Sequence, residues 1–309
     1  MIRLLGNRNV IFILAIVLGL ALPQPARWTV LAMMPALALV MTLATIHVPN
    51  SYFRHPRAIL APSLAGVAMT YGVLGSVILA ASALFIRETS LWTGFLLIAA
   101  VPPAVAVIPF TVILKGDLSW TLSGTVASYL AALLIMPLMF LIWIGTAFAD
   151  PYKLIRIMLL LIVLPLIVSR LILYWNWAGR IELFRGLLTD WGFFIVLYSM
   201  IGVNRDLIFA RPMMIAPAAL VVLASTFGLG FVIEKAGVLL KKDPKRITSL
   251  VLLGTLKNQG IAGGLAIALF EKEAALPSAV YSVFMIVYVL WLDLRRRRTS
   301  SAPESHGGS

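Results

Sequence analysis

Cysteine is absent from this chain of 309 residues, and charged residues make up only 12% of it. Without cysteine the chain cannot form disulfides, thiolate metal sites or iron–sulfur clusters, and it has no cysteine nucleophile. The three histidines, His47, His55 and His306, do not cluster along the sequence, so we expect neither a metal site nor a cofactor. A nucleotide-binding loop and a nucleophile–base pair are also missing, and we do not expect an enzyme.

Apolar residues are abundant instead. Hydrophobic residues account for 61% of the chain, with a mean hydropathy of +1.00, whereas soluble domains are about half apolar and a quarter charged. Stretches of about 17 to 25 apolar residues, long enough to cross a hydrocarbon core, recur from Val10 to Leu294. The sequence predicts an all-α polytopic membrane protein with ten transmembrane helices, at residues 10–23, 28–47, 58–85, 91–114, 119–147, 154–175, 190–205, 213–233, 247–270 and 276–294.

The first of these segments has a second interpretation. The apolar run 10–22 follows Arg3 and Arg8 and precedes a short segment, 23–26, with the small residue that a cleavage site needs. This is the form of a secretory signal peptide. We favour a membrane helix because another apolar segment follows at once, and because removal of the run would break the internal repeat described below.

Lysines and arginines lie mostly in the links between segments, which explains the net charge of +13 without a nucleic-acid partner. Ten segments place both termini on one side, and Arg295 to Arg298 assign that side to the cytoplasm by the positive-inside rule. Seventeen of the 25 basic residues are then cytoplasmic, seven lie on the other side, and the remaining one, Lys257, lies well inside a segment. We expect a protein of the bacterial inner membrane, with residues 299–309 as a disordered cytoplasmic tail.

An internal repeat relates the two halves of the chain at a constant offset of 156 residues. Matching positions are Pro56 with Pro212, Thr70-Tyr71-Gly72 with Thr226-Phe227-Gly228, Pro102-Pro103 with Asn258-Gln259, and Lys115-Gly116-Asp117 with Glu271-Lys272-Glu273. A unit of five segments enters the membrane in opposite directions in its two copies. We therefore predict two inverted five-helix repeats, residues 1–150 and 151–298, an architecture found in many secondary transporters.

Two of the segments carry residues that interrupt helices. The fourth contains Pro102-Pro103 and Pro109, which lack backbone donors and disfavour helix just before them. The ninth, its repeat partner, contains Lys257-Asn258-Gln259 followed by Gly260. Irregular backbone at membrane depth is tolerated only where it lines a cavity or is buried in protein. We predict that helices 4 and 9 are interrupted and cross there; the alternatives are a proline kink and close helix packing at the glycines.

Two stretches around these breaks carry a resemblance to a known family. The first runs from Val101 to Leu138, and the second from Asn258 to Ala266 with Leu276 to Ala279 after it. They are similar to the bile acid:sodium symporter (BASS) superfamily, which is related in fold to the sodium/proton antiporters. The resemblance implies alternating access, with a panel domain of helices 1, 2, 6 and 7 and a core domain of helices 3–5 and 8–10.

The sodium ligands of that family are not retained in this chain. Members typically read Ala-Pro-Gly-Gly-x-Ala-Ser-Asn at the break of the fourth helix, whereas Val101 to Ile108 here lacks both the Ser and the Asn. In the ninth helix the family's acidic ligand is replaced by Leu253 and its Gln by Lys257. Only Thr121 and Thr125 keep hydroxyls where the family has them. A site that has lost its carboxylate and gained an ammonium should not hold sodium.

Lys257 is the one charged residue well inside a predicted segment, and no Asp or Glu lies at comparable depth. Burying such a charge costs from about 2.5 to well over 10 kcal/mol, so it marks a functional site by default. Lys257 either loses its proton or stays charged in a wet cavity, where it meets an anionic substrate with help from helix N-termini. The predicted substrate- or ion-binding residues are Lys257, Asn258, Gln259, Thr121 and Thr125. Hydrogen bonds between helices would also explain the threonines and Asn258.

We therefore expect a secondary transporter of a small organic anion that is not coupled to sodium, with proton coupling through Lys257 left open. The alternatives are a cation/proton antiporter of the same fold, a sodium-coupled symporter with a rearranged site, and a non-transporting membrane sensor or enzyme. The expected partners are the anion and the lipid bilayer. Substrate identity, direction of transport and oligomeric state stay open.

Overall fold

A computed structural model of the chain describes residues 8–46, 56–145, 151–210 and 212–300. All the regular elements within these ranges are helices, and the single β-type pairing there is a bridge between two helix breaks. His47, His55 and His306 lie outside the described residues. The prediction of an all-helical protein is confirmed for the part of the chain that the structure describes.

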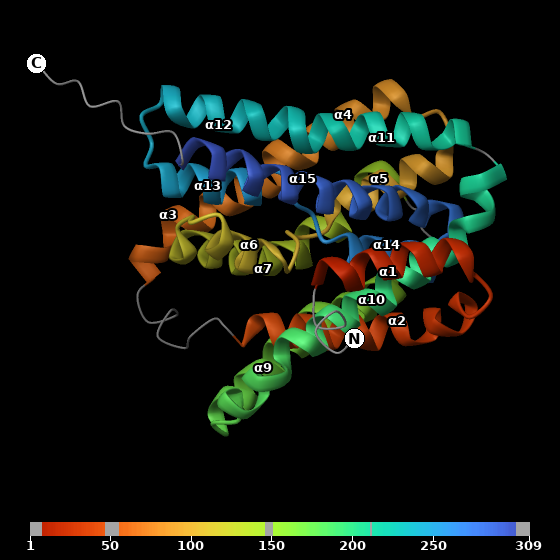
Figure 1. The fold of residues 1–309 in the computed structure, drawn as a ribbon, viewed down its shortest axis with the longest axis horizontal. Coiled ribbons are helices and arrows are strands. Elements are labelled where there is room, and N and C mark those ends of the chain that lie inside the picture. The colour runs from red at the N-terminus through yellow and green to blue at the C-terminus, as the bar shows by residue number, and fades with distance from the viewer. Residues whose placement is uncertain (1–7, 47–55, 146–150, 211, 301–309) are drawn as a thin grey trace, which may run out of the picture.

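The described residues of the first half of the chain form seven α-helices, which are labelled in Figure 1. They are α1 (Arg8–Ala21), α2 (Ala26–Thr45), α3 (Pro56–Val67), α4 (Ser76–Phe85), α5 (Thr89–Ala100), α6 (Val107–Ile113) and α7 (Leu118–Trp143). A π-helical segment, Ala68–Gly75, joins α3 to α4 without a break.

Eight further α-helices lie in the described part of the second half. They are α8 (Pro151–Met158), α9 (Leu164–Tyr174), α10 (Ala178–Ala210), α11 (Ile215–Leu223), α12 (Leu229–Leu239), α13 (Pro244–Leu253), α14 (Gln259–Leu269) and α15 (Leu276–Ser300). π-helical segments at Leu159–Val163 and Ala224–Gly228 join α8 to α9 and α11 to α12, and short 3-10 turns at Pro212–Met214 and Lys272–Ala275 precede α11 and α15.

Seven helices in the described ranges are long and apolar enough to cross a membrane. They cover residues 26–45, 59–85, 118–143, 152–174, 178–210, 212–239 and 272–295, and three shorter apolar helices cover 10–21, 89–100 and 259–269. Large apolar side chains point outward, among them Trp28 at 77% exposure and Leu134 at 77%. Such a surface is unfavourable in water and suits contact with lipid. The chain is an integral membrane protein.

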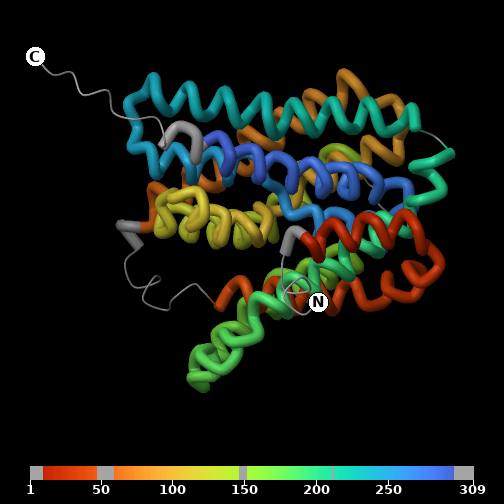
Figure 2. Tube along the Cα trace, viewed as in Figure 1, coloured from red at the N-terminus to blue at the C-terminus, as the bar shows by residue number. Residues whose placement is uncertain are grey.

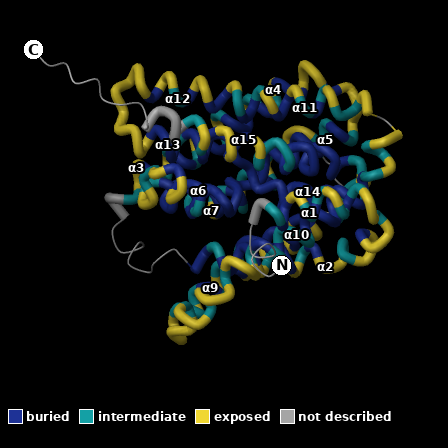
Figure 3. The backbone as a smooth tube through the Cα atoms, in the orientation of Figure 1, coloured by how far each residue is buried: buried dark blue, intermediate teal, exposed yellow. Residues whose placement is uncertain are grey.

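The helices form two groups in space. Helices α1, α2, α9 and α10 lie together on one side of the molecule in Figure 1, and α10 packs along both α1 and α2. Figure 2 shows the same neighbours by colour, with the red N-terminal helices beside the green α10. The other group contains α3 to α7 and α11 to α15. Figure 3 shows the most deeply buried residues in the middle of the molecule, around α5, α14 and α15.

A very close approach of two backbones joins α3 to α7. A Cβ atom built on Gly66 would lie 2.1 Å from the Cα of Gly124, and one built on Gly124 would lie 3.0 Å from the Cα of Gly66. Only glycine fits at such a crossing, which is the small-residue packing that membrane helices use. Gly66 and Gly124 therefore set how closely α3 and α7 approach each other.

The structure moves two of the predicted helix ends. The segment predicted at 190–205 belongs to a helix that begins at Ala178, so Asp190 lies inside α10 rather than at its end and is only 6% exposed. The expectation that no acidic residue lies deep in a segment is therefore wrong for Asp190. Helix α15 continues to Ser300, and residues 301–309 of the predicted tail lie outside the described residues.

Candidate functional site

Two helix breaks lie side by side in the structure. Helix α5 ends at Ala100 and α6 begins at Val107, while α13 ends at Leu253 and α14 begins at Gln259. Prolines in the first break have no backbone N–H, so helix cannot continue through them. The extended pieces pair as an antiparallel bridge between Pro103 and Lys257.

Backbone hydrogen bonds connect the two breaks directly. The amide of Asn258 donates to the carbonyl of Pro102 at 2.9 Å, and the amide of Ala104 donates to the carbonyl of Leu256 at 3.1 Å. Each break thus supplies partners for polar groups that the other has freed. Such mutual satisfaction is what allows irregular backbone to exist away from water.

Lys257 is fully buried at this crossing. Its Nζ donates to the carbonyl oxygens of Ala99 at 2.7 Å and Val101 at 2.8 Å, and it lies 4.4 Å from the centroid of the Tyr71 ring. These carbonyls are at the C-terminal end of α5, where the helix dipole is negative and intrahelical partners are lacking. Within the described ranges, Lys257 takes part in no salt bridge. The amino group of Lys257 therefore bonds to a helix end rather than to an acidic side chain.

Neighbouring side chains hold this arrangement in place. The hydroxyl of Tyr71 donates to the carbonyl of Ser128 at 2.8 Å, which fixes the ring next to the ammonium. The hydroxyl of Thr70 donates to the carbonyl of Leu253 at 3.2 Å, at the end of α13. The C-terminal ends of α5 and α13 thus accept hydrogen bonds from side chains of other segments, Lys257 at α5 and Thr70 at α13.

Asn258 acts as the N-cap of α14. Its Oδ1 accepts from the amide of Ile261 at 3.1 Å, which satisfies one of the four amides that a helix start leaves free. Its Nδ2 lies 3.5 Å from the hydroxyl of Tyr129, which itself donates to the carbonyl of Pro103 at 2.8 Å. The side chain of Asn258 is therefore engaged mainly with the protein.

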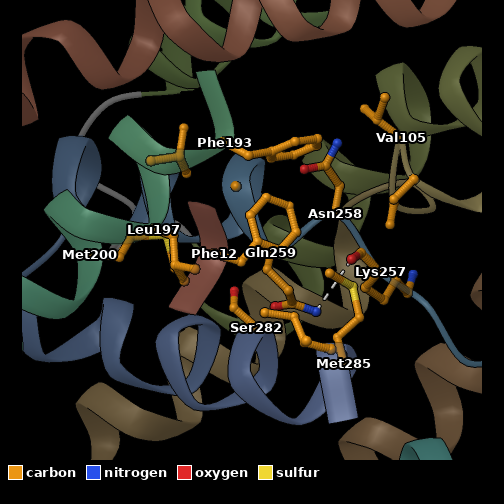
Figure 4. Close-up of a pocket in the computed structure, with 15 residues that line it drawn as sticks. Phe12, Val105, Phe193, Leu197, Met200, Lys257, Asn258, Gln259, Ser282 and Met285 are labelled. Carbon is orange, nitrogen blue, oxygen red and sulfur yellow. Dashed lines mark hydrogen bonds between the residues drawn. The ribbon is translucent and has the colours of Figure 1, made fainter. Parts of the chain in front are cut away.

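Gln259 differs from Asn258 in having an unused acceptor. The side chain is 4% exposed, and its Nε2 lies 3.4 Å from the carbonyl of Lys257. Its Oε1 is buried and has no hydrogen-bond partner in the part of the chain that the structure describes. Figure 4 shows Gln259 among the residues around a cavity, with Asn258 and Ser282 nearby. An unpaired buried acceptor costs about 1–3 kcal/mol, so a ligand with a hydrogen-bond donor would suit this position.

Two adjoining cavities open from the crossing. The smaller one, of about 50 Å³, is lined by Lys257, Asn258, Gln259 and Gly260 together with residues of α1, α10 and α15. The larger one, of about 460 Å³, lies between α2, α6, α7 and α10 and includes Pro109 in its lining. Both are lined by Phe12 and Phe193, whose rings meet edge to face with centroids 5.9 Å apart. The phenylalanine pair therefore borders both cavities.

The predicted threonines lie apart from these cavities. Thr121 and Thr125 are buried in α7, and neither lines the smaller or the larger cavity. Thr121 accepts a hydrogen bond from Thr111 at 3.0 Å, which is the interhelical role that the sequence also allowed. The hydroxyl oxygen of Thr125 is buried and has no partner among the described residues. The structure thus brings Lys257, Asn258, Gln259 and Gly260 together at the breaks, without the threonines.

Sequence reasoning assigned no role to Arg185, which lines the larger cavity. It lay in the predicted link 176–189, where it was counted only among the cytoplasmic basic residues. In the structure α10 is helical from Ala178 onward, and the first three turns carry Arg185 beside α6 and α7. The signal that could have revealed it is the uninterrupted helix-forming run 181–190, which contains neither glycine-rich nor proline turn motifs apart from Gly186.

These features define a class of protein. A lipid-embedded helical bundle with two interrupted segments crossing at a buried site is the arrangement that many secondary transporters use. Residues 29–211 match the profile of the Sodium Bile acid symporter family. The chain belongs to this family and is a membrane transporter of that type, which confirms the resemblance found in the sequence. No curated protein matches the chain.

Proposed function

We propose that the protein is a secondary active transporter that carries a small organic anion by alternating access and is not coupled to sodium. The observation that carries the proposal is the position of the Lys257 ammonium on the carbonyls of Ala99 and Val101. A cation-coupled carrier would need oxygen ligands for its ion at such a crossing. Here a covalently attached cation already neutralises the end of α5.

Ten membrane segments in two inverted repeats are part of this proposal. Helix α1 and the pairs α5–α6 and α13–α14 would add three segments to the seven long helices. The π-helical segments begin at Ala68 and Ala224, which are 156 residues apart, the same offset that relates the halves of the sequence. The bridge between the two breaks is antiparallel, as a two-fold axis at the crossing would require. Both observations support an inverted repeat.

The two groups of helices give a rationale for alternating access. We assign α1, α2, α8, α9 and α10 to a panel domain and α3 to α7 with α11 to α15 to a core domain. The cavities lie between the two groups, since α10 and α1 face the breaks across them. Movement of the core against the panel would expose the crossing to one side of the membrane and then to the other. Cytoplasmic termini complete the proposed topology.

An anion suits the smaller cavity electrostatically. Helix α14 begins at this cavity, and the N-terminal end of a helix carries a partial positive charge with free amides. None of the described residues that line the cavity is acidic. The unpaired Oε1 of Gln259 would accept a hydrogen bond from a hydroxyl that the same substrate carries. Lys257 contributes through its charge and through the geometry of the break.

Uptake into proteoliposomes tests the proposal. A panel of labelled organic acids is offered under a sodium gradient and, separately, under a proton gradient. We expect uptake of at least one acid that sodium does not stimulate, and reduced uptake or an altered pH dependence for Lys257→Gln. Lys272→Gln is the matched control, since Lys272 is exposed in the turn before α15. Sodium-dependent uptake, or an unchanged Lys257→Gln, would contradict the proposal, and sodium-driven proton release without acid uptake would indicate an antiporter.

A further inference from the structure

The larger cavity is apolar except at one end. Its volume of about 460 Å³ falls in the range of small-molecule sites. Among the described residues that line it, Arg185 is the one charged residue, and Thr189, one turn further along α10, is the one other with a polar side chain. A single arginine in an otherwise apolar lining marks where a polar group of a ligand would lie.

Arg185 has hydrogen-bonding capacity that the protein does not use. One terminal nitrogen donates to Oε1 of Glu182 at 2.7 Å, on the same helix. The Nε of Arg185 is buried and has no acceptor within the described residues. A guanidinium has five donors in a fixed fork, and a buried donor without an acceptor is unfavourable. The side chain can therefore donate hydrogen bonds to a carboxylate or another planar anion in the cavity.

The bond to Glu182 does not occupy the guanidinium fully. The Glu182 side chain is 57% exposed, whereas that of Arg185 is 21% exposed. An exposed ion pair contributes little to stability, because water competes for both partners. An anion in the cavity, which is less solvated than Glu182, can accept hydrogen bonds from the other edge of the Arg185 guanidinium. Glu182 keeps its hydrogen bond to the terminal nitrogen.

Lys257 is not the residue that binds the anionic group of a ligand. The ammonium of Lys257 is fully buried and holds the end of α5, so its hydrogen bonds are already committed to main-chain carbonyls. Arg185 belongs instead to α10, on the other side of the cavities. The positive charge at the crossing and the positive charge that can meet a ligand are thus on different residues.

We infer that Arg185 is the specificity-determining residue that captures the anionic group of the substrate, while the apolar body of the substrate fills the larger cavity between α6 and α10. This inference rests on the proposed transport of an organic anion. Phe12 and Phe193 border the cavity on the side of the helix breaks, and Phe193 lies about two turns along α10 from Arg185. The apolar body of a captured anion would therefore extend from Arg185 toward the crossing. The ligand class is a monoanion with an apolar body.

Binding of 2-naphthoate tests the inference, with 2-naphthamide as the neutral analogue of the same shape. The protein is reconstituted in phosphatidylcholine nanodiscs, and naphthalene fluorescence reports binding. We expect the wild-type protein to prefer the carboxylate by about 10- to 100-fold, as a charge-assisted bond implies. Arg185→Gln should remove the preference, and Arg185→Lys should keep part of it. Arg180→Gln, at an exposed position of the same helix, should leave it unchanged.

A second measurement locates the ligand in the cavity. Because the chain has no cysteine, Thr189→Cys supplies a single thiol that a methanethiosulfonate reagent can label. 2-Naphthoate should slow the labelling of this thiol at least several-fold, and should no longer do so when Arg185→Gln is added. This measurement remains informative if one variant is poorly folded, since Thr189→Cys itself keeps Arg185.

Specific outcomes would overturn the inference. They are an absence of 2-naphthoate binding by the wild-type protein, a carboxylate preference that survives in Arg185→Gln, and labelling that 2-naphthoate does not slow. Displacement of 2-naphthoate when phosphatidylglycerol replaces phosphatidylcholine would assign the cavity to lipid and overturn it as well. Failure of the proposed function would be seen separately, as an absence of uptake for every acid in the proteoliposome panel.

Discussion

The Nζ of Lys257 lies 2.8 Å from the carbonyl oxygen of Val101, a residue 156 positions earlier in the chain. This separation equals the offset of the internal repeat, so the two residues occupy matching positions in the two halves. The next pair at the same offset, Pro102 and Asn258, is joined by a backbone hydrogen bond of 2.9 Å. Matching residues can contact each other only near a symmetry axis, which is where the two breaks meet.

Replacing Lys257 should destabilise the crossing. Lys257→Met removes the donor to the carbonyls of Ala99 and Val101, and an unsatisfied buried polar group costs about 1–3 kcal/mol. Lys257→Gln can still donate one bond and should lose less. Thermal unfolding in detergent measures both variants against Lys272→Met, an exposed control. A wild-type melting temperature for Lys257→Met would show that the ammonium does not hold the helix end.

Tyr71 allows its ring and its hydroxyl to be separated. Tyr71→Phe removes the bond to Ser128, worth about 1 kcal/mol, and keeps the ring over the ammonium. Tyr71→Leu removes the ring as well, and a desolvated cation–π contact adds about 2 kcal/mol. Chemical unfolding should therefore rank the wild type above the Phe variant and the Phe variant above the Leu variant. Equal losses for the two variants would mean that the ring contact contributes nothing.

Asn258 should separate stability from transport. Asn258→Ala removes the cap on Ile261 and should cost about 1 kcal/mol. Asn258→Asp keeps the cap and places a negative charge at a helix N-terminus, so its stability should be close to that of the wild type. The Asp variant should nevertheless lose uptake of the anion, because the new charge faces the smaller cavity. Uptake at the wild-type rate by Asn258→Asp would argue against passage of an anion through the smaller cavity during transport.

Replacing Gln259 should lower uptake without lowering stability, which is the opposite of what is expected for a polar residue that supports the fold. Its Oε1 is buried and unpaired among the described residues, so Gln259→Leu removes an unsatisfied group and should leave stability unchanged or slightly higher. Uptake should fall strongly, since the acceptor for the substrate is lost. Melting temperature and initial uptake rate are measured on the same preparation. A large loss of stability would indicate that Gln259 serves the fold rather than the substrate.

The contact of α3 with α7 should be intolerant of a single methyl group. Gly66→Ala would bring a Cβ to 2.1 Å from the Cα of Gly124, and separating two packed helices costs about 1–3 kcal/mol or more. Gly72→Ala is the matched control, because a Cβ there meets nothing within 4 Å. We expect a lower melting temperature for the first variant and no decrease for the second. Equal melting temperatures would show that the two helices can move apart freely.

Several features of the site follow from local chemistry and could be predicted. Pro102-Pro103 cannot continue a helix, and Lys257 to Gln259 place three polar side chains in an apolar segment, so the two breaks were expected where they occur. The roles at the breaks were harder to predict. Thr121 and Thr125 have the hydroxyls of a site, yet neither residue lines either cavity.

Arg185 and Asp190 show the same limit at the level of a whole helix. Arg185 was placed in a predicted link and Asp190 at the start of a predicted segment, but α10 is continuous from Ala178. Asp190 is buried within it, and Arg185 lines a cavity. Exposure of a polar helix turn depends on what packs beside it. Sequence polarity alone does not contain that information.

The sequence by itself determined that the chain lies in lipid and where two of its segments break, because apolarity and the loss of backbone donors are properties of individual residues. Only the tertiary structure decided what Lys257 contacts. Its partners, Ala99 and Val101, lie on another segment, and their carbonyls become available only because α5 ends there. A buried polar group is stabilised by the groups that pack against it, and packing brings together residues that are distant along the chain.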